Sequence, residues 1–460
     1  MSGRDAVPDP EILAADEHAP AMDPDDARVS GFQPPSIAAG GVSAFVFRTI
    51  ELLAATLLVI VTGRLMEPAG RGLYALASLT MSLLLLPLGP VWVGNVVEMV
   101  RRRVPLKALL GGSLVIAAVG GVATGIVALA VAPLFGDRWW VVGLPAAVTP
   151  FLLLLKYEEG FYTGLGHVRA VNFVRVARAV LPLVFIAPPL LAGASPRTAI
   201  AIWTLSFVVL PLLILVPLRI LVGRPRLPDD RRYYRRVVTY GAKISGLNAV
   251  DTVNDRVGLL ALAVFASDAA VGIFSIAIAA AQVLLVAPQA LALSAFRRIG
   301  ISSAEPSAAL TARAIRHSIL LTTVGSIVAL PVVIVGVPWA VGDEYDEVPL
   351  LFALLIPNAV FLAALTSLYT YFQVQAKKPG TLLRIGGCAL AANLGLSIAL
   401  APLWGTKGVA IAASCAGALG GAVAVIAFRN ESGTRLRELL PGRAELEDYI
   451  ALVRGLLRRR

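Results

Sequence analysis

The sequence predicts an all-α polytopic membrane protein with about 12 transmembrane helices, arranged as two six-helix lobes around a central cavity. Of its 460 residues, 57% are hydrophobic and only 15% are charged, and the mean hydropathy is +0.79. Soluble domains have about 45–50% apolar and about 25% charged residues, so this composition excludes a soluble protein. Apolar stretches long enough to cross a bilayer recur along the chain, and weak internal similarity relates its two halves.

The elements follow in order. Residues 1–36 are acidic and rich in proline, without the basic segment and apolar core of a signal peptide, and we expect a disordered cytoplasmic extension. The N-terminal lobe, residues 37–222, has predicted spans at 37–62, 73–99, 107–133, 139–162, 168–193 and 198–222. A basic cytoplasmic linker, 223–239, leads to the C-terminal lobe, 240–429, with spans at 240–264, 268–295, 313–337, 347–374, 380–402 and 406–429. A basic cytoplasmic tail, 430–460, completes the chain.

Basic residues are distributed unevenly between alternate loops. With a cytoplasmic N-terminus, the outer side keeps only five of the 40 basic residues, namely Arg64, Arg71, Arg138, Arg197 and Lys407. The positive-inside rule therefore predicts a multi-pass protein of the cell (inner) membrane with both termini in the cytoplasm. We interpret residues 224–236, which are basic with interleaved tyrosines, as an interfacial helix on anionic lipid rather than a nucleic-acid site.

The segments that follow the first and seventh spans resemble each other. Gly72-Leu73-Tyr74 corresponds to Gly272-Ile273-Phe274, and Pro87 and Pro288 interrupt the spans that these segments open. Because both halves begin in the cytoplasm, the predicted repeat is parallel, with its axis along the membrane normal. Secondary transporters place their substrate sites between such halves.

Three predicted spans carry charges that a bilayer penalises, since an arginine at the centre of a span costs about 3 kcal/mol. The charged and amide residues of these spans are Arg48 and Glu51 in the first, Asn172, Arg175 and Arg178 in the fifth, and Asn248, Asp251, Asp255 and Arg256 in the seventh. Most are three or four positions apart and so share a helix face. We expect them to line a hydrated cavity in which arginines bind an anionic group and carboxylates titrate or bind a cation. The alternative is ion pairing that only fixes the packing of the helices.

Other polar groups have simpler interpretations. Lys156, Glu158 and Glu159 are close enough to the cytoplasmic end of the fourth span to snorkel. Interhelical hydrogen bonds explain Gln282, Asn358 and Asn393. Cys388 and Cys415 lie in apolar spans and the histidines are scattered, so we expect neither a metal site nor a cofactor.

Several short motifs follow one another in the same order and at similar spacing as in a known protein family. They are Gly72-Leu73-Tyr74 after the first span, Asn254-Asp255-Arg256 in the seventh, Val271–Ser275 after it, and Pro402–Ala410 before the last span. Over about residues 45–428 the chain resembles the polysaccharide-transporter flippases, Wzx-like proteins of the multidrug/oligosaccharidyl-lipid/polysaccharide (MOP) superfamily.

The resemblance implies alternating access and a polyprenyl-diphosphate-linked oligosaccharide as cargo, moved to the outer leaflet for cell-surface polysaccharide assembly. Polysaccharide assembly proteins are the expected partners. The resemblance makes Arg48, Arg175, Arg178 and Arg256 candidates to bind the diphosphate, with Asn172 and Asn248 beside them. Proton or cation coupling falls to Glu51, Asp251 or Asp255.

Alternatives remain within and outside the superfamily. A MATE-type multidrug exporter would need a cation-attracting centre, whereas Arg48 accompanies Glu51 here. A lipid II flippase commonly has more than twelve helices. A membrane glycosyltransferase or glycan polymerase would need a catalytic loop, and the only acidic candidate, Asp343–Glu347, is short. We therefore expect a transporter and not an enzyme.

Overall fold

The computed structural model describes residues 37–442, except 231, 302, 303 and 377, together with residues 445 and 447. Every regular element in this part of the chain is helical. The predicted acidic extension and nearly all of the tail after residue 442 lie outside the described residues, as do the side chains of Arg48 and Asn248.

The elements of the first half are α3 (Ile37–Leu84), α4 (Val91–Arg101), α5 (Leu106–Val115), η2 (Ile116–Gly120), α6 (Gly121–Val131), η3 (Ala132–Arg138), α7 (Trp139–Gly164), α8 (Val168–Leu191) and α9 (Pro196–Val222). Those of the second half are α10 (Arg232–Asn254), α11 (Val257–Phe265), α12 (Asp268–Val283), α13 (Val286–Ile301), α14 (Ala304–Val341), η4 (Asp343–Tyr345), α15 (Val348–Thr370), η5 (Tyr371–Gln375), α16 (Pro379–Ser432) and η6 (Leu436–Leu439). Each predicted span lies on one of these helices or on a run of consecutive ones, the longest run being α5, η2, α6 and η3 for residues 107–133.

Several helical stretches are too long to be single crossings. Within the described residues, seven helical ranges are long and apolar enough to cross a membrane, or eight if α12 and α13, which bend by 42°, form one span. The range Leu106–Gly164 has 59 residues, or about 90 Å, three times a bilayer core. It breaks at Gly136, as α3 breaks at Glu67 and α16 at Gly405, each with a positive φ. These breaks separate the paired spans that the sequence predicts, and the chain is a multi-pass membrane protein.

The prolines of the repeat lie where expected. Pro87 falls in the turns between α3 and α4, and Pro288 lies in the first turn of α13, just after the bend. A proline cannot donate a backbone hydrogen bond and disfavours a continuous helix before it. The second and eighth predicted spans are therefore both interrupted at their prolines.

The described chain forms two compact units. Unit 1 contains the residues up to Leu57, Thr80–Ile186 and Ala201–Gly246, and unit 2 contains Leu58–Leu79, Ala187–Ile200 and the residues from Leu247 onward. The boundaries fall inside α3, α8, α9 and α10, so short pieces of the first half belong to unit 2. The predicted lobes, 37–222 and 240–429, stay a prediction.

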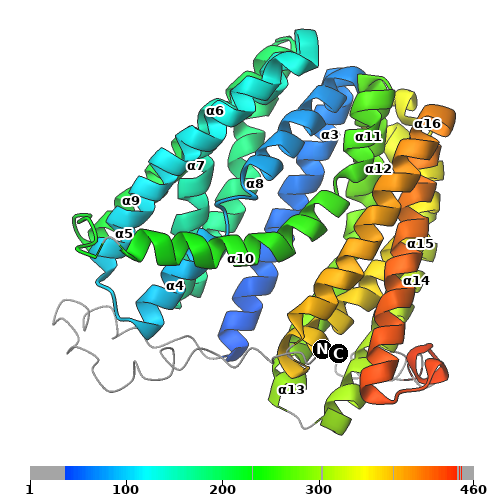
Figure 1. Cartoon of the computed structure of the whole chain (residues 1–460). Helices are drawn as coiled ribbons and strands as arrows, with labels where there is room; N and C mark the ends of the chain where they lie inside the picture. Colours follow the sequence, from blue (N-terminus) through cyan, green and yellow to red (C-terminus); the bar gives the residue numbers. More distant parts are fainter. Residues whose placement is uncertain are drawn as a thin grey trace, which may run out of the picture. The chain divides into compact units, whose positions relative to one another are not determined.

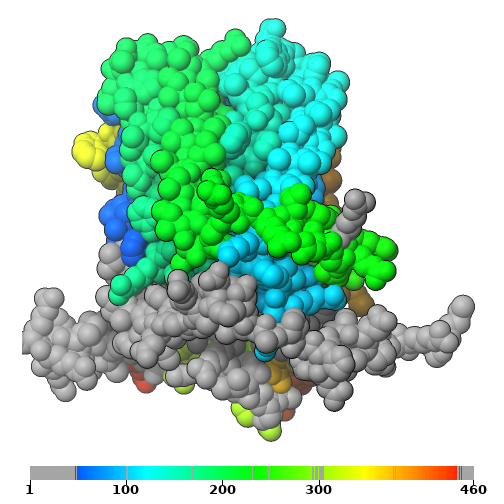
Figure 2. All heavy atoms as spheres, turned by 90° about the vertical axis from the view of Figure 1, so that its left-hand side faces the viewer, coloured from blue at the N-terminus to red at the C-terminus, as the bar shows by residue number. Residues whose placement is uncertain are grey.

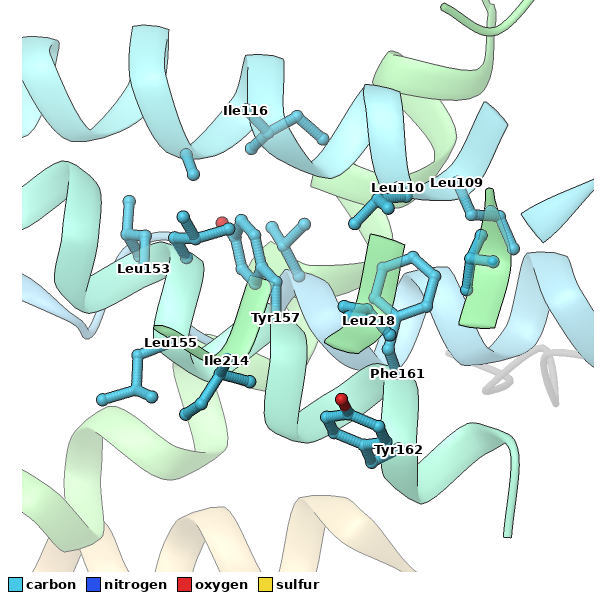
Figure 3. Packing of buried hydrophobic residues seen from close by; sticks show 14 of the residues in the cluster. Leu109, Leu110, Ile116, Leu153, Leu155, Tyr157, Phe161, Tyr162, Ile214 and Leu218 are labelled. Atoms are coloured by element: carbon cyan, nitrogen blue, oxygen red, sulfur yellow. The ribbon is translucent and has the colours of Figure 1, made fainter. Parts of the chain in front are cut away.

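The core of unit 1 is formed by α5, α7, α9 and the helices beside them. Leu109, Leu153, Tyr157, Phe161 and Leu218 are almost completely buried there (Figure 3). Tyr157 and Phe161 are one helical turn apart on α7, and the Tyr157 hydroxyl donates to the Leu88 carbonyl oxygen at 2.9 Å. Because these two large rings are buried in the core, they fix the rotation of α7 about its own axis. They thereby also set the direction in which the polar side chains between them point.

The linker between the predicted lobes belongs to unit 1. Residues 223–230 are not helical, so the predicted interfacial helix is wrong for this stretch, where Pro225 and Pro228 disfavour helix. The Arg226 amide donates to the Lys107 carbonyl oxygen at 3.0 Å. At the start of α10, the Tyr233 hydroxyl donates to Asn95 at 2.7 Å, and Arg236 holds Glu98 through two bonds of 3.0 and 2.9 Å. Figure 2 shows this segment, in green, against the blue and cyan surface of α4 and α5.

In unit 2, α14, α15 and α16 pack side by side along much of their length (Figure 1). Their buried residues include Ile315, Leu368, Phe372 and Phe428, and Leu439 of η6 joins the same cluster. Arg316 on α14 donates to the Glu438 carbonyl oxygen at 2.7 Å and pairs with Glu445. The start of the tail is thus fastened to the helices that precede it.

The two glycines of the repeat meet within unit 2. A Cβ atom on Gly72 would lie 2.7 Å from the Asp268 carbonyl carbon and 3.1 Å from the Gly272 nitrogen. A Cβ atom on Gly272 would lie 2.9 Å from both the Pro68 carbonyl carbon and the Gly72 nitrogen. The backbones of α3 and α12 therefore touch where these residues have no side chain.

Candidate functional site

Two arginines of α8 share one carboxylate of α7 in unit 1. The Arg175 Nε donates to Glu159 Oε1 at 3.1 Å, and an Arg178 terminal nitrogen donates to Glu159 Oε2 at 3.2 Å. Lys156 Nζ is 3.5 Å from the same Oε2. Because Arg175 and Arg178 are three positions apart on one helix, both guanidinium groups reach the same point on α7.

This cluster has more positive than negative charge. Lys156, Arg175 and Arg178 contribute three positive charges against the single negative charge of Glu159, which leaves the group at about +2. The Glu159 side chain is 13% exposed, whereas those of Arg175 and Arg178 are 50% and 32% exposed. The carboxylate is therefore covered while the guanidinium groups remain accessible, an arrangement that suits an anion with several oxygen atoms.

Buried polar groups without a hydrogen-bond partner lie on the same two helices. Asn172, one turn before Arg175, is buried and its Nδ2 has no partner among the described residues. Neither carboxylate oxygen of Glu158, which is 1% exposed, has a partner within the described part of the chain. Such groups cost free energy in an apolar interior unless a ligand, water or proton satisfies them.

The carboxylates of the seventh span lie in unit 2. Asp251 is on α10 and accepts from the Tyr369 hydroxyl of α15 at 3.3 Å. Asp255 and Arg256 form the short break between α10 and α11. In the preceding residue, Asn254, the backbone oxygen and the side-chain oxygen both accept from Asn393 Nδ2, each at 3.0 Å.

A cavity of about 90 Å³ opens at this break. Its polar lining residues are Asn254, Asp255, Gln282, Asn358 and Asn393. The volume is enough for a few water molecules or a small hydrated ion. Asn393 makes the interhelical hydrogen bond that the sequence predicts, and it also belongs to the wall of this cavity together with Asn358 and Gln282.

No family model matches the chain, and no curated protein matches it. Solved structures do. A structure described as the lipid II flippase MurJ in an inward closed conformation matches with a TM-score of 0.68 at 11% identity, covering 92% of this chain and 93% of that one. An inward-facing multidrug resistance MATE family transporter of the MOP superfamily matches with a TM-score of 0.65 at 14% identity, covering 85% and 99%. A structure of the MATE multidrug transporter DinF-BH gives 0.60 at 14% identity, covering 88% and 99%.

The chain shares the fold of these transporter structures. At these identities the likeness concerns the fold alone, so the polar sites rest on the residues of this chain. The predicted site residues divide between the two units of the fold, with Asn172, Arg175 and Arg178 in unit 1 and Asp251, Asp255 and Arg256 in unit 2. Glu51 is half-buried on α3, and its predicted pairing with Arg48 lies outside the described side chains.

Sequence reasoning missed the role of Glu159. It treated this acid as one that snorkels at the end of a helix, whereas Glu159 holds both arginines of α8. A signal was present, because α7 and α8 are joined by a short turn after Gly164. Glu159 and Arg175 lie about two helical turns from that turn on either side, and an antiparallel pair of helices brings such positions together.

Arg71 was also misplaced. The sequence predicts it in an outer loop, but α3 resumes directly after the break at Glu67 and Arg71 lies inside it, only 5% exposed. Its guanidinium donates to Thr62 Oγ1 at 2.6 Å and to Ser275 Oγ at 3.2 Å, and it lies 4.8 Å from the centre of the Tyr74 ring. Hydroxyl groups and an aromatic face thus stabilise this buried charge.

Proposed function

We propose that the protein is a flippase that moves a polyprenyl-diphosphate-linked oligosaccharide from the cytoplasmic to the outer leaflet by alternating access. The observation that carries this proposal is the cluster of Lys156, Glu159, Arg175 and Arg178, with its net charge of about +2 and its accessible guanidinium groups. Arginine suits a diphosphate because it stays charged and binds two oxygen atoms at once. Arg48, Arg256, Asn172 and Asn248 are the further candidates for contact with the diphosphate.

The fold supports this proposal over an enzyme. Its solved neighbours include a protein described as a lipid II flippase, which makes a lipid-linked cargo reasonable for this chain. The charges of the arginine cluster lie on α7 and α8, which are long and apolar, rather than in a loop able to cover a sugar donor. Surface polysaccharide assembly is the pathway that we propose for such a cargo, in the cell membrane and with both termini in the cytoplasm.

We propose that the cavity beside Asp255 couples transport to a proton or a cation. Its wall combines one acidic residue with three asparagines and a glutamine, and carboxylate and amide oxygens suit hard cations. Asp251, bonded to Tyr369, and Glu51 of α3 are the other candidate coupling groups. This cavity is also the feature that favours the second candidate, a MATE-type exporter of organic cations, which the arginine cluster of unit 1 disfavours.

A flipping assay tests the proposal. The full-length protein is reconstituted in liposomes with a radiolabelled polyprenyl-diphosphate oligosaccharide, and the label that becomes accessible from the opposite leaflet is counted. We expect the double variant Arg175→Ala/Arg178→Ala to lose at least about tenfold in rate, the effect of losing about 1.4 kcal/mol of binding. Arg219→Ala, a matched change at an exposed arginine on α9 of the same unit, should flip normally.

Two results would overturn the proposal. One is an unchanged rate in the double variant at equal protein abundance. The other is transport of an organic cation dye, with no flipping of the lipid, which would favour the MATE-type exporter. Mass spectrometry of the lipids that co-purify with the protein gives an independent measurement and identifies the glycan.

A further inference from the structure

Glu159 is the shared acid of the arginine cluster in unit 1. Both of its oxygen atoms are engaged, Oε1 by Arg175 and Oε2 by Arg178, with Lys156 3.5 Å from Oε2. The carboxylate is 13% exposed and lies on the α7 segment that Tyr157 and Phe161 fix in the core. It is therefore held firmly, under two arginines whose own side chains are partly open to solvent.

Each arginine still has unused donors. A guanidinium group has five N–H donors, and each arginine is seen to give one to Glu159. An incoming diphosphate finds donors available on both guanidinium groups, but it must also approach a fixed negative charge. Binding is strongest when the arginines turn from the carboxylate to the phosphate oxygens, because the two anions otherwise repel each other.

Lys156 is positioned to stabilise the carboxylate during that exchange. It lies three positions before Glu159 on the same helix, so the two side chains stay adjacent when α8 side chains move. A carboxylate left without any cation would pay a large desolvation cost at its partly buried position. With Lys156 beside it, Glu159 can release the arginines and later recover them.

We propose that Glu159 is a displaceable counter-ion for the diphosphate of the cargo: it orders Arg175 and Arg178 while the site is empty, yields them to the diphosphate, and reclaims them for release. Glu159 is thus a positioning residue that acts through the two arginines. This inference rests on the proposed cargo, and it assigns to Glu159 and Lys156 a role in the rate of release.

Removal of the carboxylate separates this role from a merely structural one. A competing counter-ion weakens binding and speeds release, so Glu159→Gln should bind the diphosphate more tightly and turn over more slowly. If Glu159 only stabilised the packing of α7 on α8, the same variant would bind more weakly and also turn over more slowly. The two roles predict opposite changes in affinity.

The experiment measures binding and flipping in the full-length protein. Titration calorimetry in detergent uses farnesyl diphosphate as the probe, with inorganic pyrophosphate to isolate the head group. We expect Glu159→Gln to bind farnesyl diphosphate about tenfold more tightly, since two partly exposed ion pairs no longer compete. The rate of flipping at saturating cargo should fall, and the half-saturating concentration should fall with it.

Two further variants control the measurement. Glu159→Asp keeps the charge, so its affinity should not increase. Glu98→Gln removes the same charge from another arginine-bound acid of unit 1, paired with Arg236, and should leave the affinity for the probe at the wild-type value. Thermal melting confirms that each variant is folded before its affinity is compared.

The outcomes distinguish failure of the inference from failure of the proposed function. If the wild-type protein binds farnesyl diphosphate and folded Glu159→Gln binds it equally or more weakly, the displaceable counter-ion is refuted while the cargo class stands. If Glu98→Gln tightens binding as much as Glu159→Gln, the effect is one of general charge and the inference also fails. If the wild-type protein binds neither probe, the proposed cargo itself is wrong.

Discussion

The contact between Gly72 and Gly272 gives the most direct test of how α3 and α12 pack in unit 2. In Gly72→Ala the new methyl carbon would lie 2.7 Å from the Asp268 carbonyl carbon, with the oxygen of that carbonyl nearer still. Non-bonded carbon atoms prefer about 3.5–4.0 Å. The obstacle is backbone, which cannot rotate aside, so the two helices must separate by at least about 1 Å at this point.

The cost follows from the energetics of overpacking. Forcing an extra methyl group into a packed interior costs about 1–3 kcal/mol. Replacing glycine by alanine in a helix also returns about 1 kcal/mol of backbone entropy, and a matched control cancels this gain. Gly395→Ala is that control, because Gly395 lies inside α16 of the same unit and a Cβ atom there would meet nothing within 4 Å.

The assay is thermal unfolding of the purified protein in detergent. We expect Gly72→Ala to be less stable than Gly395→Ala by about 1–3 kcal/mol. Gly272→Ala should behave like Gly72→Ala, because its methyl carbon would meet the Pro68 carbonyl carbon at 2.9 Å. The double variant Gly72→Ala/Gly272→Ala should lose less stability than the sum of the losses of the two single variants, because one separation of the helices relieves both clashes. Equal melting of Gly72→Ala and Gly395→Ala would refute the close approach, and strict additivity would show that the two clashes are independent.

Three further predictions concern charge. Arg48→Ala should reduce flipping at least about tenfold at unchanged protein abundance, measured in the liposome assay beside Arg219→Ala; full activity would remove Arg48 from the candidates. Asp255→Asn should abolish the dependence of the flipping rate on an imposed proton or cation gradient, and it should leave the binding of farnesyl diphosphate intact. If the variant keeps the dependence on the gradient, Asp255 is not the coupling group. In the linker, a hydrogen bond from Arg236 and the Arg232 amide hold the pKa of Asp230 below its ordinary value. Because the pKa is lowered in the folded state, this contribution to stability is present above about pH 4 and is lost as the pH falls further. The melting temperature of Asp230→Asn should therefore fall less steeply with acid than that of the wild-type protein. Thermal unfolding between about pH 5 and pH 3 measures this difference.

The helices were largely predictable, because apolar runs of membrane length are bounded by short polar turns. Their breaks were predictable where proline marks them, as at Pro87 and Pro288. Pro68 likewise marks the break at Glu67, because a proline disfavours the helical conformation of the residue before it. The positive φ of Glu67 was not predictable, since it is uncommon for a residue other than glycine. The boundaries of the compact units, which cut through α3 and α10, depend on packing between distant segments and cannot be read from local composition.

The charged residues show the same limit at the level of single side chains. The spacing of Arg175 and Arg178 was visible in the sequence, but their common partner was not, because an acid near a helix end usually extends to the interface. Arg71 was assigned to a loop because it falls between the predicted spans 37–62 and 73–99. Its partners, Thr62, Ser275 and Tyr74, are ordinary helix residues, and only the packing of α3 against α12 makes them a site for a cation.

The glycine contact bears on the origin of the two halves. Gly72 and Gly272 are 200 positions apart, and so are the residues that they touch, Pro68 and Asp268. Gly72 approaches the carbonyl of Asp268, and Gly272 approaches the carbonyl of Pro68. Equivalent residues exchange partners in this way when a two-fold axis passes between them. The alignment of these short segments therefore reflects a local two-fold symmetry in the structure, rather than chance similarity between apolar helices. A side chain at either glycine would disturb both copies of the same contact, which is why the double variant is the decisive measurement.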